Sequence, residues 1–280
     1  MATKTKLPVF QGKPLVEIPA VIPSADFLGG DFGKPVLEEY NGRVKSDYNN
    51  ASALNVLSYD DKVAMGSNPF AVVLINQIVS QEGLRTATQA DLEKILKLNA
   101  LDLRGFYEDS ALVLRNQDDP NKYLAKNLAE QIKARQKLRY PIMLPLNGVE
   151  LVNDSDSEYG LAFKLKEDAE IIYAPQLAHK NNHKKFSEAD EKGLPIFDKN
   201  GERTLYTRES GLVRLYLGRD LGLHSYGVDL AFSDSDGRVV IIRSGEATQN
   251  FIDEINKEYQ EQLDELNAKR EKALNILISK

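Results

Sequence analysis

Hydrophobic and polar side chains alternate along residues 203–243, and this alternation constrains the fold more than any other feature of the sequence. The run that begins at residue 212 reads Leu-Val-Arg-Leu-Tyr-Leu. Successive side chains of a β-strand point to opposite faces of the sheet. We therefore expect one face of this strand in the core, formed by Val213, Leu215 and Leu217. Arg214 and Tyr216 share the other face, and both combine a flat group with a polar tip.

Similar runs of period two continue back to residue 141, and each is bounded by turn residues. Asn147-Gly148 is the strongest short hairpin signal in the chain. The turns predict that the following segments pair as hairpins: 142–146 with 149–152, 161–166 with 170–173, 196–197 with 204–206, and 227–232 with 238–243. About eight short strands within roughly 100 residues are typical of an antiparallel β sandwich or barrel-like domain. We therefore predict an α+β fold whose β domain spans 141–245.

The region 61–140 carries helical signals instead. Asn68-Pro69 combines a capping side chain with proline at the first helical position. Thr88 and Asp91 have the spacing of a capping box, and Asp119-Pro120 predicts the start of a further helix. Two helices followed by a strand over 105–115 also suggest a winged-helix module, although a purely structural helical pair is the more common arrangement.

The two ends of the chain predict contacts between subunits. Residues 1–60 are rich in Pro and Gly, which predicts an extended arm, and 246–280 have a partial heptad pattern, which predicts a long helix. Closed homo-oligomers are common among soluble proteins. We therefore expect a homo-oligomer, with contacts centred on Ile252, Ile255 and Tyr259.

Composition excludes several kinds of chemistry. The chain has no cysteine, which rules out disulfides, thiolate catalysis and cysteine-ligated metals. A net charge of −6 argues against general nucleic-acid binding. No apolar run has the length of a signal peptide or of a membrane span, which takes roughly 18 apolar residues. We expect a cytoplasmic protein that has no membrane, metal or cofactor partner.

Candidate site residues are few. His179 and His183 have the spacing of two metal ligands on one helical face, but neighbouring lysines repel a cation and no further ligands lie nearby. The central stretch is the better candidate for a ligand site. Its flat cationic and aromatic groups suit an anion, a sugar or a nucleobase, and we assign them as candidate ligand-binding residues: Arg208, Arg214, Tyr216 and Arg219. Local ion pairs on a sheet face are the alternative interpretation.

These observations favour a non-enzymatic structural or interaction protein that self-associates through its N-terminal arm and C-terminal helix. No nucleophile or metal motif indicates a reaction, and we assign no catalytic residue. Catalysis by carboxylates alone stays open, as in a hydrolase of sugars or phosphoesters. A pocket holding two carboxylates with separated pKa values is the feature that favours that alternative. A winged-helix regulator that binds nucleic acid is the third hypothesis.

Overall fold

The computed structural model of the chain describes residues 9–10, 13–14, 25–60, 62–243 and 260. The chain divides into two compact units: Ser24–Arg243 form one, and the two ends form the other. In the unit of the two ends, β1 (Val9–Phe10) pairs antiparallel with β2 (Lys13–Pro14). The predicted C-terminal helix lies outside the described residues, as do its proposed contact residues Ile252, Ile255 and Tyr259.

Helix α1 (Gly30–Ser46) lies where the sequence predicts an extended arm, so that prediction is wrong for these residues. Its buried apolar side chains recur at helical spacing: Val36, Leu37, Tyr40 and Val44. Glycines in the first turn and Pro35 inside the helix obscure this period in the sequence, because both residue types disfavour helix interiors. The short strand β3 (Ala25–Phe27) precedes the helix.

The predicted starts of the next two helices are confirmed. Oδ1 of Asn68 caps α2 (Pro69–Val79) by accepting a hydrogen bond from the backbone N–H of Ala71 at 2.8 Å. Thr88 and Asp91 form the predicted capping box of α3 (Gln89–Leu98). Nearly every residue of α2 is buried, and this helix packs against α1 and against the large sheet.

Helix α4 (Lys122–Lys133) begins later than the sequence predicts. The predicted start belongs instead to a loop, where the carbonyl oxygen of Pro120 accepts a hydrogen bond from the backbone N–H of Leu212 at 3.0 Å. Asn121 immediately precedes the helix, and its side-chain amide donates to the carbonyl oxygens of Leu212 and Val228, both at 2.8 Å. The loop before α4 is therefore fixed to the central strands.

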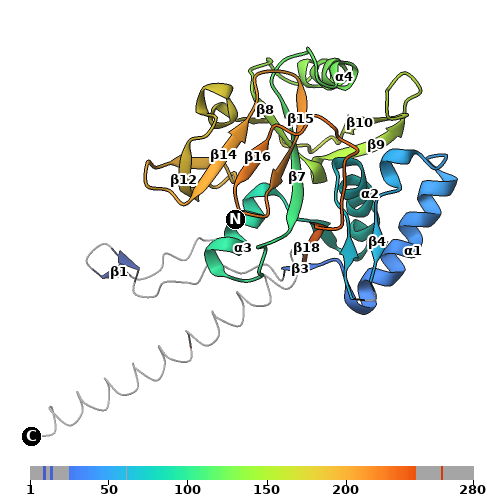
Figure 1. Cartoon of the computed structure of the whole chain (residues 1–280), viewed down its shortest axis with the longest axis horizontal. Coiled ribbons are helices and arrows are strands. Elements are labelled where there is room, and N and C mark those ends of the chain that lie inside the picture. The colour runs from blue at the N-terminus through green and yellow to red at the C-terminus, as the bar shows by residue number, and fades with distance from the viewer. Residues whose placement is uncertain (1–8, 11–12, 15–24, 61, 244–259, 261–280) are drawn as a thin grey trace, which may run out of the picture. The chain divides into compact units, whose positions relative to one another are not determined.

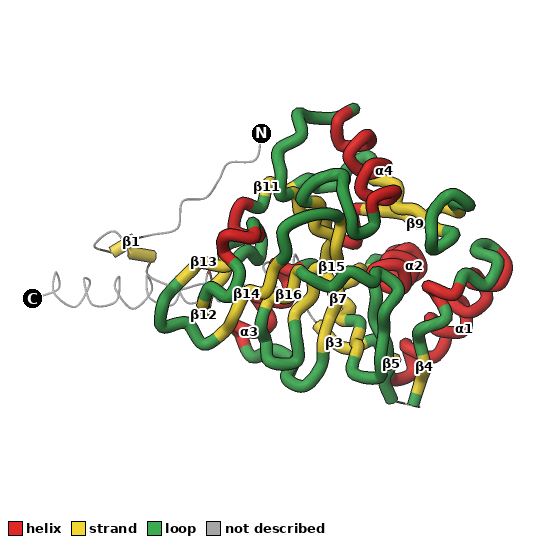
Figure 2. Tube along the Cα trace, turned by 45° about the horizontal axis from the view of Figure 1, so that its top comes forward, coloured by secondary structure: helices red, strands yellow, loops and turns green. Residues whose placement is uncertain are grey.

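Nine of the described strands form one curled, mostly antiparallel sheet in the order β11-β8-β7-β15-β16-β14-β12-β13, with β17 paired to the start of β7 (Figures 1 and 2). The pairs β14–β16 and β7–β17 are parallel. The strands of this sheet have the following bounds: β7 (Tyr107–Leu114), β8 (Ile142–Pro145), β11 (Ile172–Tyr173), β12 (Lys185–Ala189), β13 (Pro195–Phe197), β14 (Arg203–Thr207), β15 (Leu212–Leu217), β16 (Leu223–Ser225) and β17 (Gly237–Arg238).

Most strands lie where the sequence predicts them, but the predicted hairpin pairings are wrong. Asn147-Gly148 lies in a 3-10 turn that leads from β8 to β9 (Val149–Asn153). β9 pairs with β10 (Leu161–Leu165), while β8 pairs with β7 and β11. β13 and β14 each pair with β12 rather than with each other. A turn sequence specifies a change of direction, but the burial of each strand selects its partner.

The last predicted hairpin is also wrong, because residues 226–236 form a loop instead of a strand. β18 (Val240–Arg243) follows and joins a separate sheet of three strands, between β3 and β6 (Leu84–Thr86). A further short pair, β4 (Ser58–Tyr59) with β5 (Ala64–Met65), lies beside α1 and α2 in Figure 1.

The central strand has the predicted faces for Val213 and Leu215, whereas Leu217 follows a register shift and is buried in a separate cluster with side chains of α3 and β18. Val213 and Leu215 are fully buried in a cluster that lies inside the curl of the sheet. On the opposite face, Leu212 and Leu112 pack against the layer that contains α1, α2 and α4. Arg214 and Tyr216 continue this second face along β15, beyond the apolar side chains.

The fold is therefore α+β with a mostly antiparallel sheet, as predicted, and the curled sheet is nearer to the barrel-like alternative than to a sandwich of two sheets. The four α-helices of the described residues all lie in the N-terminal half of the chain. A search of the same residues finds no helix with the length and apolar character needed to cross a membrane.

Candidate functional site

A cavity of about 450 Å³ lies beside Tyr216, and we call it the Tyr216 pocket. One wall consists of side chains from β7, β15 and β16, including Tyr107, Arg214 and His224. The other wall is the loop 226–236, which contributes Val228 and Phe232. In Figure 1 the central strands lie side by side, so residues far apart in the sequence meet here.

A β-bulge sets the polar face of this pocket. The register between β7 and β15 shifts between Leu215 and Tyr216, so that Tyr216 lies opposite Asp109. The carboxylate of Asp109 therefore lies on the same face of the sheet as Arg214. Bulges commonly re-aim side chains in this way near functional sites.

Arg214 is almost completely buried, with 3% of the residue exposed. Its Nε lies 2.8 Å from Oδ1 of Asp109, and its Nη2 donates to Oδ2 at 3.0 Å. Its Nη1 donates to the carbonyl oxygen of Phe232 at 2.6 Å. The guanidinium carbon lies 4.7 Å from the ring centre of Tyr216 and 5.1 Å from that of Tyr107. Arg214 thus holds the loop onto the sheet, and its charge is neutralised by Asp109.

Burial raises the pKa of Asp109, whereas Arg214 and the Ser67 hydroxyl oppose that rise. The Ser67 hydroxyl donates to Oδ2 of Asp109 at 2.8 Å. Burial lowers the pKa of Arg214, but the charge of Asp109 together with Tyr107 and Tyr216 outweighs this effect and the net shift is upward. Removal of either partner leaves a buried, uncompensated charge, which is strongly destabilising.

Arg219, on the turn after β15, is also paired. Its Nη2 contacts the carboxylates of Asp234 and Asp236, at 2.6 and 2.9 Å. The pocket lining thus holds two guanidinium groups, both neutralised, and three carboxylates. Of these carboxylates, Asp234 is a partner of Arg219, whereas Asp220 and Asp229 form no ion pair with an arginine among the described residues. This balance disfavours an anionic ligand and favours a neutral or cationic one.

His224 lies within a cluster of aromatic rings. Its ring centre is 5.0 Å from that of Tyr216 and 4.7 Å from that of Tyr206. Its Nε2 lies 3.2 Å from Oδ1 of Asp220, and its Nδ1 is buried without a hydrogen-bond partner among the described residues. Burial lowers the pKa of His224, and the Asp220 carboxylate opposes the shift. The imidazole is therefore neutral at pH 7, and its unbonded nitrogen is shielded from solvent.

The structure brings three of the predicted site residues together at this pocket: Arg214, Tyr216 and Arg219. Arg208 is not part of the lining. Sequence analysis missed Tyr107 and Phe232, because the first comes from a distant strand and the second from a segment predicted as a strand. Asp220 and His224 are four residues apart, across a turn that contains Gly222. This spacing is a local signal of their contact.

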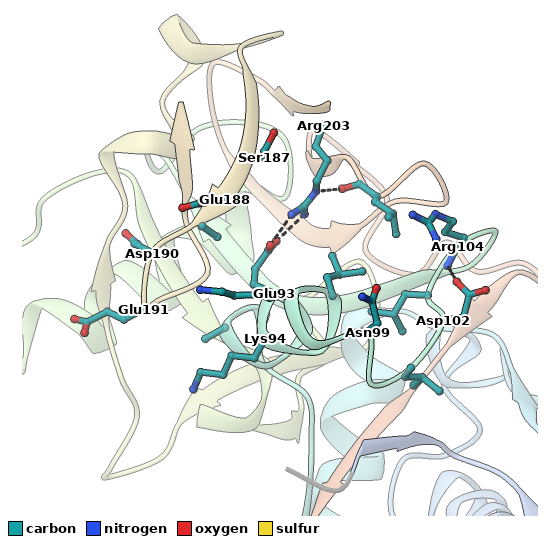
Figure 3. Close-up of a pocket in the computed structure, with 17 residues that line it drawn as sticks. Glu93, Lys94, Asn99, Asp102, Arg104, Ser187, Glu188, Asp190, Glu191 and Arg203 are labelled. Atoms are coloured by element: carbon teal, nitrogen blue, oxygen red, sulfur yellow. Dashed lines mark hydrogen bonds and ion pairs between the residues drawn. The ribbon is translucent and has the colours of Figure 1, made fainter. Parts of the chain in front are cut away.

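A second cavity, of about 530 Å³, lies between α3 and β12 (Figure 3). At its centre, the guanidinium of Arg203 makes two hydrogen bonds to the carboxylate of Glu93, at 2.6 and 2.7 Å. Nε of Arg203 donates to the carbonyl oxygen of Leu221 at 2.6 Å. Lys94 and Glu188 are exposed to solvent on either side. This cavity offers a satisfied ion pair and solvated charges, without a group aimed at a ligand.

The predicted histidine pair is not brought into a metal site. The ring of His183 packs edge-on against that of Tyr206, with the ring centres 5.5 Å apart. Within residues 25–60 and 62–243, no three side chains of His, Asp or Glu are grouped so that they could hold a metal ion.

Comparison with known proteins identifies no family. No protein-family model matches the sequence, and no solved structure matches the chain. A stretch of 79 residues is 34% identical to the 4-hydroxybutyrate–CoA ligase (ADP-forming) of Nitrosopumilus maritimus strain SCM1. The stretch makes up 28% of this chain and 11% of that ligase, so the similarity covers a small part of both proteins.

Proposed function

We propose that the protein binds a small neutral or cationic molecule in the Tyr216 pocket. The ligand has a flat apolar face, like that of a sugar ring or a nucleoside, and carries O–H or N–H donors. The proposal rests on the lining of the pocket, which combines aromatic rings with more carboxylates than unpaired cationic groups. Tyr107, Tyr216 and Phe232 supply ring surfaces, and beside the two paired arginines the lining holds two further carboxylates, Asp220 and Asp229.

The rim of the pocket supports binding from solvent. The side chains of Tyr226, Val228 and Phe232 are exposed, and all three belong to the loop 226–236. Large apolar side chains that cluster on a surface commonly mark a ligand or partner site. A ligand that stacks on Phe232 therefore removes exposed apolar surface from water, which favours binding.

Binding is better supported than hydrolysis. A hydrolase that uses two carboxyl groups needs one of them to stay protonated near neutral pH. The carboxyl groups with raised pKa values among the described residues are those of Glu108 and Asp109, and neither is part of the pocket lining. The pKa of Asp220, which does line the pocket, is lowered. Burial raises it, but the hydrogen bonds to the backbone N–H of Gly222 and to His224 together lower it by more.

Nucleic-acid binding by a winged helix has less support than ligand binding. The helix α2 is buried along nearly all of its length, so it offers no face to a groove. α3 offers Lys94 and Lys97, both of which line the second cavity. Two lysines supply only a small part of the phosphate contacts that DNA binding requires.

Self-association through the N-terminal arm and the C-terminal helix remains a separate proposal for the ends of the chain. It rests on the heptad pattern around Ile252, Ile255 and Tyr259. Light scattering on the full chain and on a chain ending at Arg243 tests it. The proposal predicts that the full chain is larger than a monomer and that the shortened chain is monomeric.

Paired ligands test the proposal for the Tyr216 pocket. The melting temperature of the full chain is measured with adenosine against AMP, and with glucose against glucose 6-phosphate. In each pair we compare the part of the rise that depends on Phe232, which is the rise in the wild type minus the rise in Phe232→Ala. We expect this part to be larger for the neutral member of at least one pair than for its phosphorylated form. Phe32→Ala, which alters an exposed ring on α1, preserves the effect. A Phe232-dependent rise that is larger for the phosphorylated members, or an unchanged effect in Phe232→Ala, contradicts the proposal.

A further inference from the structure

Arg115, directly after β7, is a buried cation that has no carboxylate partner within the described part of the chain. Only 6% of the residue is exposed. Its Nε and Nη2 donate to the carbonyl oxygen of Leu177 at 3.2 and 2.9 Å, and Nη2 also donates to the hydroxyl oxygens of Ser225, at 2.8 Å, and Thr207. All of these acceptors are neutral. Nη1 is buried as well and has no hydrogen-bond partner among the described residues.

A second arginine lies beside the first. Arg208 follows β14 and is half-buried; its Nε is shielded from solvent without a partner in the described part of the chain. Its Nη1 makes one long hydrogen bond, 3.4 Å, to the carbonyl oxygen of Tyr226. Burial and, to a smaller extent, the charge of Arg208 together lower the pKa of Arg115 to about 9. No carboxylate of the described residues counteracts either effect. Glu209, the neighbouring acid in the sequence, makes no ion pair within residues 62–243.

Two like charges in one partly buried place are unfavourable unless an opposite charge binds there. Buried donors without an acceptor are rare in proteins and call for a specific explanation. A water molecule satisfies such donors but leaves both positive charges uncompensated. An oxyanion satisfies the donors and neutralises the charge, and guanidinium groups suit carboxylate and phosphate oxygens especially well.

The position of these groups in the fold also suits a ligand. Thr207 ends β14 and Ser225 ends β16, and these two strands are parallel, so their carboxyl ends meet at one edge of the sheet. Arg115 lies just past the carboxyl end of β7. Two hydroxyl groups and two guanidinium groups thus converge from three strand ends, and Arg208 is the one of the four that is partly exposed.

We propose that Arg115 and Arg208 form a binding site for a small oxyanion, either a phosphate group or a carboxylate, at the carboxyl ends of β14 and β16. The side chain of Arg208 moves away from Tyr226 to admit the anion, and both guanidinium groups then donate to it. This site differs from the Tyr216 pocket, whose arginines are already paired with carboxylates. It also gives Arg208, which the pocket does not use, a ligand-binding role of its own.

Calorimetric titration of the full chain tests the proposal. Inorganic phosphate and acetate are titrated separately into the wild-type protein, with sodium chloride used to hold the ionic strength constant. We expect saturable binding of one anion per chain, and the tighter of the two identifies whether the site prefers phosphate or carboxylate. In Arg208→Gln we expect binding to weaken at least about tenfold, because one charged donor group is lost.

Arg43→Gln is the matched control, since it removes a partly exposed arginine of α1 whose partner is Glu39. We expect this variant to bind the anion with unchanged affinity. Arg208 is half-buried, and the urea midpoint of each variant verifies that the fold is intact. Absence of saturable binding of either anion overturns the proposal. Equal affinity in the wild type and Arg208→Gln, or equal weakening by Arg43→Gln, shows an adventitious ion only and also overturns it.

Discussion

Replacing Glu108 with Gln removes a buried acid whose protonation links the stability of the fold to pH. Glu108 lies on β7 opposite Leu217, with 2% of the residue exposed. Neither of its carboxyl oxygens has a hydrogen-bond partner among the described residues. Burial and, to a smaller extent, the charge of Asp109 raise its pKa from 4.5 to about 8, against the opposing charge of Arg238. The folded protein therefore holds this proton at pH 7, whereas the unfolded chain releases it.

The size and sign of the effect follow from this shift. The folded state binds the proton more tightly, so stability is fully present below pH 4.5 and is lost as pH rises toward about 8. Each unit of pKa difference corresponds to about 1.4 kcal/mol, which places an upper bound of about 5 kcal/mol on the whole loss. Gln has nearly the same shape and carries no charge. We therefore expect Glu108→Gln to match the wild type near pH 5 and to be more stable by about 4 kcal/mol at pH 8.

Urea unfolding of both proteins between pH 5 and pH 8 measures this difference directly. Other groups that titrate contribute equally to both proteins, so the difference between the two curves isolates Glu108. A difference that stays constant with pH refutes the reasoning. So does a variant that becomes relatively less stable at high pH, because that result shows an ionised Glu108 paired with Arg238.

Three further predictions follow from the core and the pocket. Leu215→Ala is expected to lower the free energy of unfolding by about 2–5 kcal/mol, because the side chain is fully buried. Arg214→Ala is expected to lower it by about 3–5 kcal/mol, because it leaves Asp109 unpaired. Urea unfolding measures both losses, and a small effect of Arg214→Ala contradicts the buried ion pair. Asn68→Ala is expected to lower the free energy of unfolding by about 2–4 kcal/mol. It removes the cap of α2 and the amide that donates to the carbonyl oxygens of Ala53 and Ala231. A loss of less than about 0.5 kcal/mol, the size expected of an ordinary surface substitution, contradicts these contacts. An NMR titration of His224 is expected to give a midpoint below 6.5, and a lower one still in Asp220→Asn, which removes the opposing carboxylate; a midpoint above 6.5 in the wild type contradicts the buried environment.

The sequence predicts those features that depend on neighbours along the chain. Asn68 and Thr88 identify two helix starts because a cap acts within three residues. The alternation around Arg214 identifies the buried face of β15 because strand periodicity is also local. Helix α1 is not predicted from the sequence, because its glycines and Pro35 disfavour a helix and obscure the helical spacing of its buried apolar side chains.

The pairing of strands and the composition of the site depend on distant residues. Asn147-Gly148 predicts that the strands before and after it pair with each other. Instead, β9 pairs with β10, and β8 belongs to the large sheet. The bulge that places Asp109 beside Arg214 arises between two strands about a hundred residues apart, and no local pattern encodes it. The sequence therefore suggests Arg214 as a ligand-binding residue, while the structure makes it the anchor of the pocket wall.

The most direct test of the Tyr216 pocket is to locate the bound ligand by NMR. The full chain, labelled in its Phe and Tyr rings, is titrated with whichever neutral probe, adenosine or glucose, raises the melting temperature more. The account predicts that the ring signals of Phe232 and Tyr216 shift with a common saturation curve. The ring signals of Phe32 and Tyr173, which are exposed aromatic residues outside the pocket, do not shift. Shifts at Phe32 or Tyr173 without shifts at Phe232 and Tyr216 contradict the claim that this pocket binds the ligand.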